Sequence, residues 1–251
     1  MKVACVLFGQ PRDYMTGYNN LMKFFKDQSG VDVEFFYHFW TLNKGESYCK
    51  SPWRKDIDPN TLSYIENIEE HLKSLYNPLS YEYENQSDGI YFDIKSLMRT
   101  ISYRNMPPLK QSNIYNTIFQ MYSRNKARNL LNNYIEKTNA KYDYVVFTRF
   151  DIDELLNVNV SDLNMSSYVY LKLSWSHCQS IVFHDKMIIA PTDIFLKWFD
   201  IFDKLKNILE NPFHLDKMRT NRYNIDINPE ELIFSKYILE FDNLDKVKYV
   251  S

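Results

Sequence analysis

Apolar positions in the first forty residues follow two different periods. Residues 3–8 form an unbroken apolar run, which is typical of a strand buried on both faces of a parallel sheet. Leu21, Phe24 and Phe25 then recur at helical spacing, and residues 31–40 are rich in β-branched and aromatic side chains. This strand–helix–strand order predicts an α/β fold with a mostly parallel central sheet flanked by helices.

The pattern weakens between residues 43 and 112, where turn signals interrupt it. Asn-Pro at 77–78, a polar stretch at 86–89 and Pro-Pro at 107–108 mark breaks. Helical spacing is present only over residues 61–75. We therefore expect loops with one or two short elements here, and the segment is a candidate flap or insertion beside a site.

Periodic segments return after residue 112 and continue the α/β pattern. The expected elements are a long helix over 115–135 that ends near Asn139, strands at 142–148, 168–173, 180–183 and 187–190, a helix over 194–205, and a last helix opened by Asn228-Pro229-Glu230-Glu231. A chain of 251 residues fits one domain of this class. We therefore expect residues 1–251 to form a single domain.

Composition limits the class of ligand. Hydrophobic residues make up 45% and charged residues 25%, as in ordinary soluble domains. Only 5 glycines are present, and neither GxGxxG nor GxxxxGK[ST] occurs, which argues against a glycine-rich dinucleotide or phosphate loop. A net charge of −2 provides no basic surplus for a nucleic-acid backbone. Nucleic acid is therefore not an expected partner.

The strand at 142–148 ends in an arginine and two carboxylates, Arg149, Asp151 and Asp153. In an extended segment these two carboxylates point to the same side, where they repel each other unless a cation or water separates them. Divalent cations prefer oxygen ligands, and open α/β sheets bind ligands at the carboxyl ends of their strands. The pattern indicates either a metal-assisted ligand site or a solvated acidic turn.

A second polar motif follows the first strand. Gly9, Gln10, Pro11 and Arg12 come directly after the apolar run, so they are expected at the same sheet edge as Asp151. A glycine lets a ligand approach the backbone, and an arginine binds phosphate or stacks on a base. The alternative is an ordinary strand-to-helix turn.

Together the motifs resemble those of glycosyltransferases from large DNA viruses and bacterial surface-polysaccharide loci. In that family one strand ends in (S/F)GQPR, matched by residues 8–12, and a later strand ends in R-x-D-x-D, matched by residues 149–153. A helix between them carries a Tyr-Ser pair, matched by Tyr122 and Ser123, followed here by Lys126. The resemblance covers roughly residues 1–200.

The resemblance implies a GT-A fold whose DxD motif holds Mn²⁺ or Mg²⁺ against a nucleotide-sugar diphosphate. Asp151 and Asp153 are the implied metal ligands, with His184 as a candidate third. The implied donor-binding residues are Gly9, Gln10, Arg12, Ser123, Lys126, Arg149 and Asp151. The implied activity is metal-dependent transfer of a sugar, most simply from a UDP- or GDP-linked donor, to a glycan or another hydroxyl acceptor.

An inverting transfer needs a carboxylate that removes a proton from the acceptor hydroxyl. Asp185 is the first candidate, because the family has an aspartate before a short apolar strand. Glu230 is the second candidate. Glu231 also fits, although its position three residues after Asn228 is that of a capping box.

Two other functions remain open from the residues. Phosphatases of the haloacid dehalogenase type also end a strand in DxD, but there the first aspartate attacks phosphorus, and the motif here lies late in the chain. A non-catalytic sugar- or protein-binding module on the same fold is the other alternative, since fold does not determine function.

The expected location follows from two absences in the sequence. No apolar run is long enough to span a bilayer, and the first apolar run is too short for a signal peptide. The three cysteines, Cys5, Cys49 and Cys178, contain no CxxC pair, which favours a reducing compartment. We expect a cytoplasmic protein, in the host cytoplasm if the chain is viral. The oligomeric state is not predicted.

Overall fold

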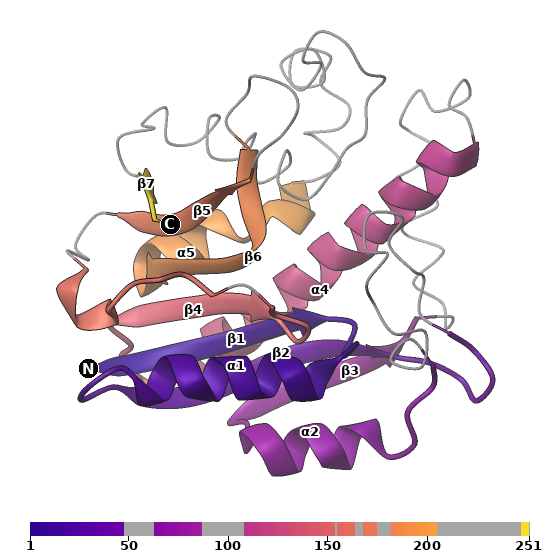
Figure 1. The fold of residues 1–251 in the computed structure, drawn as a ribbon, viewed down its shortest axis with the longest axis horizontal. Helices are drawn as coiled ribbons and strands as arrows, with labels where there is room; N and C mark the ends of the chain where they lie inside the picture. Colours follow the sequence, from indigo (N-terminus) through magenta and orange to yellow (C-terminus); the bar gives the residue numbers. More distant parts are fainter. Residues whose placement is uncertain are drawn as a thin grey trace, which may run out of the picture.

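A computed structural model describes residues 1–47, 63–86, 108–153, 155–163, 168–174, 182–204 and 247–250 of the chain. The strands are β1 (Lys2–Gly9), β2 (Asp32–Thr41), β3 (Ser80–Asn85), β4 (Tyr144–Arg149), β5 (Val169–Ser174), β6 (Val182–Pro191) and β7 (Val247–Tyr249), and the helices are α1 (Tyr14–Lys26), α2 (Ile68–Tyr76), α4 (Pro108–Thr138) and α5 (Thr192–Trp198). Figure 1 shows the strands as one layer with helices on both sides.

The described strands form one sheet of seven in the order β3-β2-β1-β4-β6-β5-β7. Neighbouring strands among β3, β2, β1 and β4 are parallel, whereas β6 runs antiparallel to both β4 and β5. The expected α/β class with a mostly parallel sheet is confirmed, and the sheet is mixed because of β6. We call the side at which β1 to β4 all end, at Gly9, Thr41, Asn85 and Arg149, the carboxyl edge.

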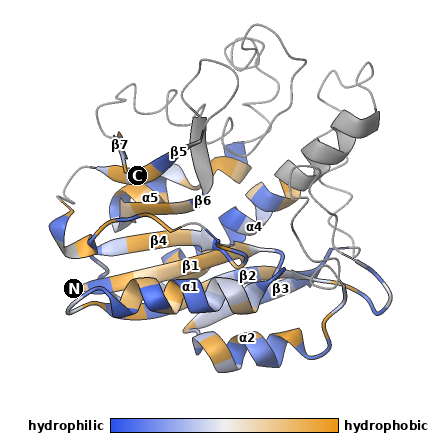
Figure 2. Cartoon of the chain, in the orientation of Figure 1, coloured by the Kyte–Doolittle hydropathy of each residue, from blue (hydrophilic) through white to orange (hydrophobic). Residues whose placement is uncertain are grey.

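Burial explains the unbroken apolar run in β1. Ala4, Val6 and Phe8 pack into the core under α4 and α5, and the residues between them pack into a second core under α1 and α2. A strand covered on both faces has no polar side, which is why the run shows no alternation. Figure 2 shows hydrophobic positions along β1 and a mixture of both kinds on α1 and α2.

Helix α4 is long and largely polar, and one of its faces is buried against the sheet. It begins at Pro108, earlier than the expected 115, because proline is well suited to the first turn of a helix. It ends at Thr138, where Asn139 adopts a positive φ of 55° and its N–H bonds to the Ile135 carbonyl. The expected end near Asn139 is confirmed. Within the described ranges, no helix is both long and apolar enough to cross a membrane.

In its described part, the segment between β2 and α4 contains two short elements, α2 and β3, as expected, but their bounds and types were only partly predicted. The helix expected over 61–75 begins only at Ile68, because Asn67 has a positive φ of 54° and is not helical. Strand β3 was not expected, since its residues SYEYEN lie at the open border of the sheet and need little apolar character. Residues 48–62 and 87–107 are outside the described part of the chain.

Two further boundaries differ from the expectation. The strands expected at 180–183 and 187–190 are one strand, β6, because the polar run at 184–186 interrupts the apolar pattern without ending the strand. The helix expected over 194–205 stops at Trp198, and a new helical turn begins after Asp200, a residue type favoured at helix N-caps. The helix expected after Asn228 lies outside the described residues.

Gly17 lets helix α1 contact the backbone that follows β4. A Cβ at Gly17 would lie 1.8 Å from the Phe150 carbonyl oxygen and 3.2 Å from the Ile152 nitrogen. Nearby, Asn20 Nδ2 donates to the Ile152 carbonyl at 2.9 Å. The helix therefore fixes the position of the segment that carries Asp151 and Asp153.

Replacing Gly17 with alanine should destabilise the protein. Alanine raises helix propensity by about 0.5–1 kcal/mol, but the overlap with backbone atoms should cost about 1–3 kcal/mol or more. We expect urea unfolding to show a net loss for Gly17→Ala. The exposed Asn19→Ala on the same helix is the control and should be neutral or stabilising. Equal stability of the two variants would contradict the close packing.

Candidate functional site

The two motifs found in the sequence meet at the carboxyl edge. β1 and β4 are adjacent and parallel, and Phe8 pairs in register with Arg149. The residues that follow each strand are therefore neighbours. Arg12 Nη2 lies 3.2 Å from Asp151 Oδ2, although the two residues are 139 positions apart.

Asp151 is the centre of this meeting point. Arg149 donates from Nε to Oδ1 at 2.8 Å and from Nη2 to Oδ2 at 2.7 Å, which is the bidentate geometry of a strong charge-assisted pair. The Asp151 side chain is only 3% exposed. A carboxylate buried this far requires paired cations, and the two guanidiniums supply them.

Asp153 has a different environment from Asp151. β4 ends at Arg149 and a turn follows at residues 150–151, so strand alternation no longer governs the two carboxylates. The Asp153 side chain is 36% exposed, and its Oδ1 accepts from Lys186 Nζ at 2.6 Å. Lys186 sits beside the end of β4, because its carbonyl accepts from Thr148 Oγ1 at 2.7 Å. Each of the two carboxylates at this edge thus has its own cationic partners.

The loop between β1 and α1 is held from three other elements. Gly9 has a φ of 99°, a conformation that favours glycine, and its N–H donates to Ser123 Oγ of α4 at 2.8 Å. Gln10 Nε2 donates to Gln86 Oε1, just after β3, at 2.8 Å. Arg12 completes the set through Asp151. The loop is therefore preorganised in this structure.

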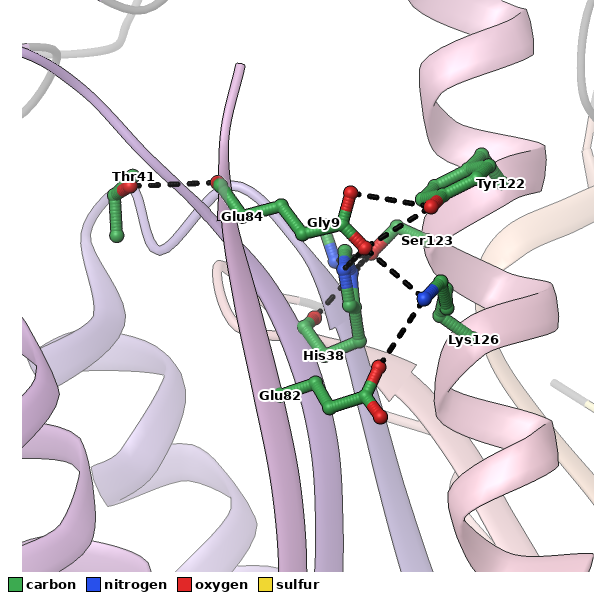
Figure 3. A network of polar contacts seen from close by, with 8 residues as sticks. All are labelled: Gly9, His38, Thr41, Glu82, Glu84, Tyr122, Ser123 and Lys126. Atoms are coloured by element: carbon green, nitrogen blue, oxygen red, sulfur yellow. Dashed lines mark hydrogen bonds and ion pairs between the residues drawn. The ribbon is translucent and has the colours of Figure 1, made fainter. Parts of the chain in front are cut away.

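Behind Gly9 lies a buried polar network (Figure 3). His38 of β2 is fully buried, and its Nδ1 lies 2.8 Å from Ser123 Oγ. Its Nε2 lies 3.6 Å from Glu84 Oε1 of β3. Glu84 also accepts from the Tyr122 hydroxyl at 2.9 Å and is 3.1 Å from Lys126 Nζ. Four elements are joined in this way.

The charges of the network set its proton positions. Burial alone would raise the pKa of Glu84, but contacts with His38, Lys126 and Tyr122 outweigh it and lower the pKa to about 2. Burial lowers the pKa of His38 below 6.5 despite Glu84, so the ring is neutral at pH 7. An anionic Glu84 near Nε2 favours the tautomer with the proton on Nε2. Ser123 Oγ accepts from Gly9 N–H and lies 3.3 Å from the His38 carbonyl, to which it donates.

The described side chains do not fit a resident divalent ion. No group of three or more His, Cys, Asp or Glu side chains among the described residues is placed to hold a metal. Both oxygens of Asp151 accept from guanidiniums, and Asp153 contacts an ammonium. A cation entering here would face these positive charges at close range.

The structure gathers some of the sequence-predicted site residues and not others. Those at the carboxyl edge are Gly9, Gln10, Arg12, Arg149, Asp151 and Asp153. Ser123 is fully buried behind Gly9, and Lys126 is paired with Glu84 and Glu82. His184 and Asp185 belong to β6, but their side chains lie outside what the structure describes, and Glu230 and Glu231 lie outside it altogether.

Sequence reasoning missed His38, Glu84 and Lys186. His38 interrupts the aromatic run at 35–40, and a histidine among buried aromatic residues near the carboxyl edge was a usable signal. Glu84 belongs to the strand that was not expected. Lys186 lies between the strands expected at 180–183 and 187–190 and was given no role.

A scan against protein-family models finds no matching family, and a search of curated proteins finds no match.

Glu84 should make stability depend on pH in acid. Its folded pKa of about 2 lies below the ordinary 4.5, so it contributes stability above pH 4.5 that is lost as the pH falls toward 2. We expect Glu84→Gln to lose about 1–3 kcal/mol of unfolding free energy at pH 7. The gap to the native chain should close between pH 4.5 and pH 2.

Urea unfolding at several pH values measures this gap. The control is Glu82→Gln, which removes the exposed neighbouring carboxylate that also contacts Lys126. A gap for Glu84→Gln that stays constant down to pH 2 would show that its carboxylate is not the stabilising group.

Proposed function

We propose that this protein is a glycosyltransferase of the GT-A type that uses a nucleoside-diphosphate sugar as donor and a glycan or another hydroxyl compound as acceptor. The observation that carries the proposal is the contact of Arg12 with Asp151. It joins the two motifs on which the family resemblance rests, at the sheet edge where α/β proteins bind ligands.

The diphosphate of the donor is proposed to lie at this edge. Arginine is suited to phosphate because its planar fork makes two parallel hydrogen bonds, and both Arg12 and Arg149 are held there by Asp151. Gly9 offers close backbone approach, because no atom of the described residues lies within 4 Å of the position a Cβ would take. Ser123, being buried, would act on the donor through Gly9 rather than by contact.

Asp185 is the proposed base or acceptor-binding residue. In the antiparallel pairing of β4 and β6, Met187 lies opposite Thr148. Asp185 precedes Met187 by two residues. Because the two strands are antiparallel, it lies on the side of Met187 toward which β4 ends. The backbone of β6 therefore carries Asp185 toward the carboxyl edge, where transfer is proposed to take place.

A phosphatase of the haloacid dehalogenase type is less well supported. In such an enzyme the first aspartate of DxD attacks phosphorus and needs a free oxygen facing the substrate. Here that residue is Asp151, which is buried and accepts hydrogen bonds at both oxygens from two guanidiniums. These contacts lower its nucleophilicity and block its approach.

The proposal is tested by donor binding. In buffer with Mn²⁺, one or more of a panel of UDP- and GDP-linked sugars should raise the apparent Tm by about 5–10 °C at a hundredfold excess over Kd. The corresponding monophosphates should give smaller shifts, since they lack the second phosphate. Absence of any shift across the panel, together with turnover of an aryl phosphate, would reject the transferase in favour of a phosphatase.

Asp185→Asn tests the assignment of the base. Asparagine keeps the size and hydrogen bonding of the side chain but accepts no proton, so transfer should fall by about 10²–10⁴-fold while donor affinity stays near the native value. If Asp185 anchors the acceptor instead, the KM for acceptor should rise more than kcat falls. A variant with native kcat and KM would exclude both roles and direct the test to Glu230.

A further inference from the structure

The chemistry of the carboxyl edge differs from that of a metal-dependent site. A DxD motif that recruits a divalent ion must offer the ion free carboxylate oxygens. Arg149 and Arg12 already make three hydrogen bonds to the two oxygens of Asp151, so an ion that binds this carboxylate must approach a side chain that two guanidiniums already contact. A metal ion that displaced these partners from Asp151 would leave two largely covered guanidiniums without their counter-charge.

Asp153 does not restore a metal site within the described residues. Its contact with Lys186 at 2.6 Å places an ammonium where an ion bound to Oδ1 would lie. Arg12, Arg149 and Lys186 bring three cationic side chains into contact with the carboxylates of Asp151 and Asp153. A further cation beside either carboxylate would therefore be repelled at close range, whereas an anion would be attracted to the same side chains.

We infer that Arg12, Arg149 and Lys186 form a cationic clamp that binds the diphosphate of a nucleotide without a divalent metal. In this arrangement Asp151 is a positioning residue that orients the two guanidiniums, and the three cations donate charge-assisted hydrogen bonds to phosphate oxygens. The inference rests on the proposed function and adds to it. Protein cations, in place of a metal ion, would stabilise the charge on the departing nucleoside diphosphate.

Isothermal titration of the full chain tests the clamp with UDP, GDP and inorganic pyrophosphate. Each titration is run once in EDTA and once in Mn²⁺. The clamp predicts that at least pyrophosphate and one nucleotide bind in EDTA, with a Kd within about threefold of that in Mn²⁺. This comparison uses the native chain, so it does not depend on any variant folding.

A variant then assigns the binding to the clamp. Lys186→Ala removes the cation of the clamp that contacts Asp153 while leaving the Asp151 pairs intact, and it should weaken binding in EDTA roughly ten- to a hundredfold. The matched control is Lys23→Ala, which removes one exposed lysine of α1 and should bind as the native chain does. Equal affinity of the two variants in EDTA would overturn the assignment.

The outcomes separate this inference from the proposed function. Binding of nucleotides only when Mn²⁺ is present would overturn the clamp and leave the glycosyltransferase proposal standing. Binding of pyrophosphate but of neither nucleotide in EDTA would show an anion site that does not accept a nucleotide, which would overturn the clamp as inferred and count against the proposed donors. If none of the three probes binds in either buffer, both proposals are wrong.

Discussion

The buried carboxylate of Asp151 is the constraint on which the carboxyl edge depends. It is 6% exposed as a residue, and such a charge is stable only when cations neutralise it. One cation, Arg149, comes from its own segment, and the other, Arg12, comes from the loop after β1. The two ion pairs therefore hold together the loop after β1 and the segment after β4, which the sheet alone only places side by side. The same contacts determine what the site can bind, since they use the carboxylate oxygens that a metal would need.

The other side of the loop is held by a neutral network rather than by an ion pair. Gly9 N–H donates to Ser123, whose hydroxyl faces a neutral His38. Only at its far end does the network reach a charge, the Glu84 carboxylate beside Lys126. The position of Gly9 is thus coupled through α4 and β2 to a strand at the border of the sheet.

The elements that the sequence predicted well are strands of the central sheet that are buried on both faces. β1, β2 and β4 each contain a mainly apolar stretch because helices cover both sides of the sheet, so their place and direction were evident. The sequence also placed Gly9 and Asp151 at one edge, because parallel strands share their carboxyl ends. β3 could not be found in this way: a border strand with charged side chains, Glu82 and Glu84, has no apolar signature. The roles of His38 and Lys186 depend on contacts between distant segments, which spacing along one segment does not report.

The spacing of Asp151 and Asp153 shows why a motif alone leaves its chemistry open. Two carboxylates one residue apart suggest a shared cation only while the backbone stays extended. Here the strand stops at Arg149, the chain turns at once, and Gly17 allows α1 to pack against that turn. The carboxylate of Asp151 is buried beside two guanidiniums, and the carboxylate of Asp153 remains partly exposed beside Lys186. The same sequence in an extended strand would favour a metal ion. In this turn its carboxylates instead orient the cations that favour an anionic ligand.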